Sequence, residues 1–96
     1  MLLSRDSTQI FQGDAASNRP RATAMSYQED NQGVIDTYAP EFLDSPSSTS
    51  ALTYKVQVRV GSGGGTASVN RSARHSDQTS YDMVTASSIT VMEIKG

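Results

Sequence analysis

Hydrophobic and polar residues alternate along the middle of this chain with the period of a β-strand. Within residues 51–60 every second side chain is apolar, namely Leu52, Tyr54, Val56, Val58 and Val60. A strand places alternate side chains on opposite faces, whereas a helix would scatter these five around its circumference. The pattern therefore predicts a strand with one buried and one solvent-facing side.

Shorter segments of strand-like composition lie on both sides of this one, and none predicts a helix of useful length. Residues 2–5 and 9–12 predict a hairpin that turns at Asp6 and Ser7, whose side chains favour turns. The other expected strands are 19–27, 34–43, 66–70 and 86–94. The glycine-rich stretch 61–65 predicts a second hairpin between the strands on either side of it.

The last expected strand differs from the others because both of its faces are apolar. Ile89 and Val91 share one face, and Met92 and Ile94 share the other. A strand that is covered on two sides has this composition. We therefore expect it either to run centrally in a β-sandwich or to place Met92 and Ile94 in a subunit interface.

The composition indicates one small domain with little material for a core. The chain has 96 residues, of which 35% are hydrophobic and 6% aromatic. A domain of this size hides only about 60–65% of the surface that its unfolded chain exposes. Cysteine is absent and His75 is the single histidine, so disulfides, thiolate zinc sites and histidine-rich metal sites are excluded, and we expect no cofactor. Oligomerisation is the remaining source of stability.

Charge and hydropathy exclude two classes of partner. The net charge is −2, and the eight Lys and Arg residues are scattered instead of forming a stripe that would neutralise phosphates. No apolar run approaches the roughly 20 residues that span a bilayer, and residues 1–3 lead into a polar stretch instead of a signal-peptide core. We expect neither nucleic-acid binding nor membrane insertion, and no export signal.

Three patterns resemble catalytic or ligand sites without meeting their requirements. Residues 61–66 lack the Lys and the following helix of a phosphate-binding loop. His75 and Asp77 flank Ser76, but triads are built from distant positions on a rigid scaffold. The acidic residues match neither a calcium loop nor a glycosidase pair in their spacing; they are Glu29, Asp30, Asp36, Glu41 and Asp44. Solvated loops are the simpler interpretation, and a histidine at a threefold axis would need a trimer.

Two polar loops, 28–33 and 71–81, are the expected contact surfaces for a receptor or partner. Their candidate residues are Glu29, Asp30, Asn31, His75, Asp77 and Tyr81. A tyrosine ring offers an apolar face and a polar tip, which suits contact with sugars. Tyr81 is the better exposed candidate, whereas Tyr54 is expected to pack in the core.

Several segments, in order along the chain, carry a family resemblance. They are Gly13-Asp14-Ala15-Ala16 followed by Arg19 and Arg21, Phe42-Leu43-Asp44-Ser45-Pro46, Leu52-Thr53-Tyr54-Lys55-Val56-Gln57-Val58, Val69-Asn70-Arg71-Ser72 and Ser87-Ser88-Ile89-Thr90-Val91-Met92-Glu93-Ile94. Spread over nearly the whole chain, they resemble the C-terminal module of phage and environmental-virus tail-fibre or virion-surface proteins. The resemblance implies an antiparallel, jelly-roll-like β-sandwich similar to the trimeric heads of the C1q and tumour-necrosis-factor type.

The chain departs from that pattern in two places. Modules of this kind carry further strands before the segment that resembles residues 2–5, and Asn18 and Pro20 replace a small residue and a Thr. Missing strands leave backbone edges unpaired and apolar side chains uncovered. We therefore expect residues 1–96 to form a single module that is the C-terminal part of a longer domain, or one whose sheet other subunits complete.

The resemblance implies a non-enzymatic structural protein located in the virion. We expect a homotrimeric tail-fibre or appendage module that contacts other virion proteins and attaches to a host-surface glycan or protein. One alternative is a capsid-decorating protein that binds no host molecule. Another is a carbohydrate-binding module of a secreted protein, against which the absence of Trp counts.

Overall fold

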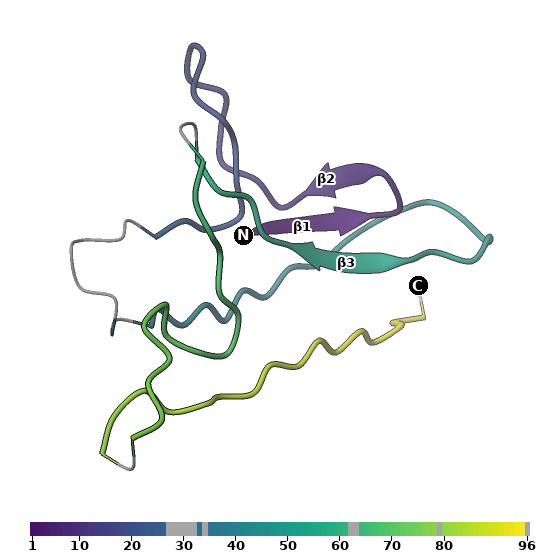
Figure 1. Ribbon diagram of the computed structural model, residues 1–96. Coiled ribbons are helices and arrows are strands. Elements are labelled where there is room, and N and C mark those ends of the chain that lie inside the picture. Colours follow the sequence, from purple (N-terminus) through teal and green to yellow (C-terminus); the bar gives the residue numbers. More distant parts are fainter. Residues whose placement is uncertain (27–32, 34, 62–63, 79, 96) are drawn as a thin grey trace.

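The computed structural model describes residues 1–26, 33, 35–61, 64–78 and 80–95 and shows one small antiparallel sheet. Its strands are β1 (Leu2–Arg5), β2 (Thr8–Ile10) and β3 (Tyr54–Gln57), in the order β2-β1-β3 (Figure 1). The described residues contain no helix, and hence none that has the length and apolarity to cross a membrane. The chain is all-β, as the sequence predicts.

The first hairpin forms where the sequence predicts it. Arg5 pairs with Thr8 and Leu3 pairs with Ile10, and the turn between them has Asp6 at a φ of 51°. Asp tolerates this left-handed region better than most residues do. The second strand ends at Ile10 and not at the expected residue 12, because Phe11 has a φ of 46° and leaves the ladder.

The central strand forms over part of its predicted length. In β3, Val56 pairs with Leu3 and Tyr54 pairs with Arg5, so the apolar residues of β3 share a face with Leu3. Asp6 continues this ladder, since its amide donates to the Thr53 carbonyl at 2.7 Å and its carboxylate accepts from the Thr53 amide at 2.8 Å. The alternating pattern thus predicted the correct face.

The prediction that this face is buried is wrong. Val56, Val58 and Val60 are 49%, 55% and 41% exposed, and no apolar side chain among the described residues is buried. Tyr54, which was expected in the core, is half-buried. The reason is that no second sheet covers this face among the described residues.

The predictions of the remaining strands are wrong, because these segments do not form strands among the described residues. Segments 19–26, 35–43, 66–70 and 86–94 have no strand assignment, and the second hairpin, around 61–65, has no ladder between its described arms. Val69, in the expected strand 66–70, is 58% exposed. Alternation favours an extended backbone, but a strand also needs a neighbour that supplies hydrogen bonds. The described part of the chain supplies few.

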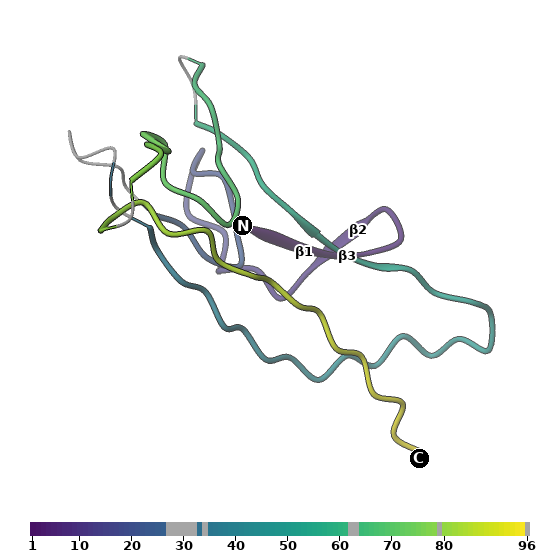
Figure 2. The ribbon, with the colours of Figure 1, turned by 60° about the horizontal axis from the view of Figure 1, so that its bottom comes forward.

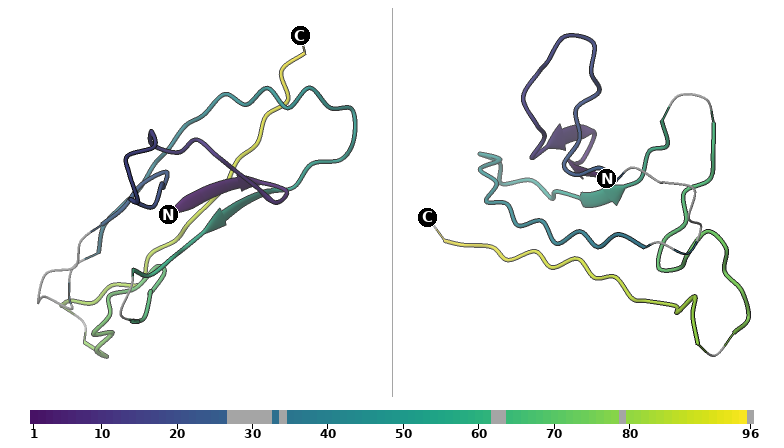
Figure 3. Two further views of the ribbon diagram at one scale, coloured as in Figure 1. Left: turned by 90° about the horizontal axis from the view of Figure 1, so that it is seen from above. Right: turned by 90° about the vertical axis from the view of Figure 1, so that its left-hand side faces the viewer.

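The outline of the chain is open and flat. The radius of gyration is 16.3 Å, whereas a compact domain of this length has about 12.5 Å. The principal extents are 49 × 35 × 17 Å. Segments 35–46 and 86–95 lie on the same side of the sheet and run as extended traces (Figures 2 and 3). The described residues thus form one sheet with two extended segments beside it, and they do not form a complete β-sandwich.

Candidate functional site

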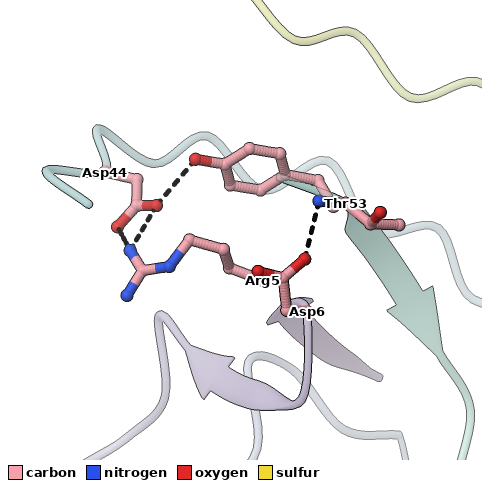
Figure 4. A network of polar contacts seen from close by, with 5 residues as sticks. Arg5, Asp6, Asp44 and Thr53 are labelled. Atoms are coloured by element: carbon pink, nitrogen blue, oxygen red, sulfur yellow. Dashed lines mark hydrogen bonds and ion pairs between the residues drawn. The ribbon is translucent and has the colours of Figure 1, made fainter. Parts of the chain in front are cut away.

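A polar cluster of three side chains joins the sheet to segment 35–46. Arg5 of β1 donates from one guanidinium nitrogen to both oxygens of Asp44, each at 2.6 Å, and the Tyr54 hydroxyl donates to Asp44 at 2.8 Å (Figure 4). The side chains of Arg5 and Asp44 are 23% and 15% exposed. Asp44 was expected in a solvated acidic loop; instead it anchors this segment against the apolar face of the sheet.

This cluster of Arg5, Asp44 and Tyr54 is here called the sheet cluster, and its polar groups stabilise one another. The hydrogen bonds from Arg5, helped by that from Tyr54, lower the pKa of the Asp44 carboxyl, and partial burial only partly opposes them. The same carboxylate raises the pKa of the Tyr54 hydroxyl, chiefly through the hydrogen bond. Asp44 therefore stays ionised and Tyr54 stays neutral, which suits a structural tie and not proton transfer.

A second cluster organises residues 70–87, here called the 70–87 loop. Arg74 donates to the two oxygens of Asp82, both at 2.7 Å, and the Asp82 side chain has no exposed surface. The Ser76 amide donates to the same carboxylate at 2.9 Å. The Arg74 guanidinium also lies 4.6 Å from the ring centre of Tyr81. A paired, bidentate carboxylate of this kind fixes the path of the loop.

The backbone of the 70–87 loop turns at residue types that accept left-handed conformations. Asn70, His75 and Asp82 have φ values of 61°, 45° and 60°, and Asn, Asp and His are enriched in this region. The Thr85 amide donates to the Asn70 carbonyl at 2.8 Å and closes the base of the loop. The Ser87 hydroxyl bonds to the Asn70 side chain.

The structure brings three of the predicted contact residues together in this loop. His75, Asp77 and Tyr81 are all exposed, and Tyr81 keeps 44% of its surface accessible. Arg74 covers one face of the Tyr81 ring. His75 and Asp77 line an open depression of about 420 Å³, together with Met83 and Val84 among others.

Hydrogen bonds fix the Asp82 carboxylate and the His75 backbone within the 70–87 loop. Arg74 donates a hydrogen bond to the Asp82 carboxylate. The backbone amide of His75 donates to the Ser72 hydroxyl at 3.1 Å. No three potential metal ligands cluster in the part of the chain that the structure describes. The loop thus presents the exposed side chains of His75, Asp77 and Tyr81 on a frame held by the pair of Arg74 and Asp82.

Two further groups of predicted residues have a different outcome. Glu29, Asp30 and Asn31 lie outside the described residues. Met92 and Ile94, predicted at a subunit interface, are 80% and 72% exposed in the single chain. They are therefore accessible to a partner, and their interface role stays a prediction.

The sequence did not point to Arg74, Asp82 or Arg5. The partners in each pair are separated by intervening loop, and spacing carries no signal for contacts of this kind. One sequence feature could have indicated the path of the loop, namely the residue types at its turns. Asn70 and Asp82 lie in a polar stretch, and both residue types favour left-handed conformations.

The pH dependence of the two clusters follows from the direction of their pKa shifts. Arg74, followed by the Ser76 amide, holds the pKa of Asp82 well below the ordinary 3.8, and Arg5 lowers that of Asp44. A lowered pKa gives stability that is present above pH 3.8 and is lost as the pH falls further. The raised pKa of Tyr54 gives stability that is present below pH 10 and is lost as the pH rises through the folded value.

Carboxyl-carbon NMR titration measures this directly. We expect the Asp44 and Asp82 signals to titrate below pH 3.8, and Arg74→Gln to move only the Asp82 midpoint upward. A midpoint for Asp82 that is the same in the wild type and in Arg74→Gln would contradict the described ion pair.

No protein-family model, no curated protein and no solved structure matches this chain when it is compared with them.

Proposed function

We propose that this chain is a non-enzymatic structural protein of a virion, a module that trimerises in a tail fibre or another surface appendage and attaches to the host. The observation that carries the proposal is the amount of exposed apolar surface. Large apolar side chains lie exposed on β3 and on segment 86–95, and none is buried among the described residues. A chain with this surface is built to associate.

The excess of surface is large enough for a permanent assembly. The chain exposes 8330 Å², whereas a compact monomer of 10.3 kDa exposes about 5,400 Å². The difference of about 2,900 Å² is in the range that obligate interfaces bury. Association with further copies would supply the core that the described residues of the single chain lack.

The family resemblance supports a location of this assembly in a virion appendage, and the loop geometry supports its role in attachment. Virion appendages of the resembling type are trimeric β-modules, and the sheet of this chain is a fragment that neighbours would extend. The 70–87 loop presents His75, Asp77 and Tyr81 from a fixed frame. Three copies of one weak contact multiply into tight attachment, because the second and third contacts are intramolecular.

Immunogold labelling of purified particles tests the location. An antibody raised against the chain is expected to label an appendage at the particle surface. Label spread evenly over the shell would favour a capsid-decorating protein instead, and particles without label would contradict a virion protein.

Adsorption to host cells tests the attachment role. Tyr81→Ala is expected to lower adsorption of the assembled protein by at least about tenfold, because an aromatic contact worth about 1 kcal/mol is lost in each of three copies. Tyr38→Ala is the matched control, since Tyr38 is a similarly exposed tyrosine outside the loop. Equal adsorption by the two variants would contradict attachment through this loop.

A further inference from the structure

We infer that residues 88–95, here called the C-terminal arm, add as a strand to the outer edge of β3 in a second copy of this chain. The inference deepens the proposed function and rests on it, because it names the element through which copies complete one another. It follows from an open sheet edge, an extended segment without partners, and the character of the side chains on both.

The acceptor is the edge of β3 that faces away from β1. The Thr53 backbone bonds to Asp6, which continues β1. Backbone groups alternate in direction along a strand, so Tyr54 and Val56 direct their amide and carbonyl groups to the opposite side. Among the described residues no backbone group bonds to them there. An open edge of this kind is a template for another strand.

The donor is the C-terminal arm. The last anchors before it are the bonds of Thr85 and Ser87 to Asn70. From residue 88 onward the described chain shows no hydrogen bond or ion pair, and every described residue of the arm is exposed. The arm is separated from the sheet of the same chain in the view of Figure 1 and in the right panel of Figure 3. The arm therefore lies apart from its own β3 edge and is available to another copy.

Side chains on the arm match those on the acceptor edge. Lys55 lies on the polar face of β3, and Val56 lies on the apolar face. If Glu93 stands beside Lys55, opposite charges meet, and Met92 and Ile94 come to the face that carries Val56. One register thus pairs the opposite charges on one face and the apolar side chains on the other. The total accessible surface of about 2,900 Å² beyond that of a compact monomer is ample for such an exchange.

Engineered disulfides test the pairing, since the natural chain has no cysteine. Val56→Cys is mixed with separately purified Met92→Cys, Ile94→Cys or Val91→Cys, and the mixture is oxidised mildly. We expect a covalent heterodimer with Met92→Cys or Ile94→Cys, detected by mass spectrometry of the intact protein. Val91→Cys is the matched control, because its side chain points to the other face and its sulfur cannot reach the partner.

The outcome separates this inference from the proposed function. A wild-type chain that is oligomeric, with no heterodimer from either Met92→Cys or Ile94→Cys, would overturn the arm exchange and leave association through another surface. Equal cross-linking by all three arm variants would also overturn it, because random collision does not distinguish faces. A wild-type monomer would overturn both proposals together.

Discussion

Replacing Met92 and Ile94 together by aspartate is expected to convert the assembled protein into monomers. Both side chains are largely exposed in the single chain, so the change costs little there. In the assembly it removes two buried apolar side chains, each worth about 1.5–3 kcal/mol, and places two carboxylates in an apolar contact. A combined loss above about 4 kcal/mol raises the dissociation constant at least about a thousandfold.

Sedimentation velocity at a fixed concentration measures this change. The control carries the same two added charges at exposed polar positions outside the arm, as Thr66→Asp with Gln78→Asp. We expect the control to sediment like the wild type. Dissociation of the control to the same extent as the Met92 and Ile94 variant would mean that net charge, and not the arm, governs association.

Asp44→Asn is expected to release segment 35–46 from the sheet. The amide that replaces the carboxylate has one acceptor oxygen instead of two, so it loses one of the two hydrogen bonds from Arg5 and leaves the guanidinium without its counter-charge. Apart from the stacking of the Phe42 ring on Phe11, with ring centres 4.8 Å apart, little apolar burial holds this segment, so its local opening depends strongly on the sheet cluster. We expect hydrogen exchange in residues 35–46 to become about tenfold faster.

Hydrogen exchange followed by mass spectrometry makes the comparison peptide by peptide. Tyr54→Phe is the matched control, because it removes one hydrogen bond from Asp44 and keeps the ion pair with Arg5. It should give a smaller increase, confined to the same segment. An increase as large as that of Asp44→Asn would show that the hydroxyl and not the ion pair anchors the segment.

The local structure of the chain was predictable where a short pattern decides it. Residues 2–5 form a strand because Asp6 and Ser7 make a tight turn, and both strands of the hairpin then lie next to each other in sequence. The alternation in 51–60 likewise predicted which side chains share a face. In both cases the predicted feature depends on residues close in sequence or on the alternation of side chains along a pleated strand.

The packing of the chain was not predictable in the same way. Residues 35–43 and 86–94 have the composition of strands but lack strand partners in the described chain, because alternation specifies a conformation and not a neighbour. The buried face expected for 51–60 depends equally on a covering layer. The prediction of a buried face assumes that a core exists, and the described residues of the single chain do not provide one.

The candidate loop was predictable in position and not in construction. His75, Asp77 and Tyr81 were expected to be exposed because they lie in a polar stretch, and they are. The pair of Arg74 and Asp82, which holds the loop, depends on three left-handed residues that bring distant side chains together. No spacing rule encodes such a path.

The account depends most on the claim that several copies complete one fold. The molar mass of the purified wild-type chain, measured by light scattering across a dilution series, tests it directly. We predict a stable species of about 31 kDa, three times the 10.3 kDa of one chain, that persists on dilution. A folded 10.3 kDa monomer at every concentration would contradict the account.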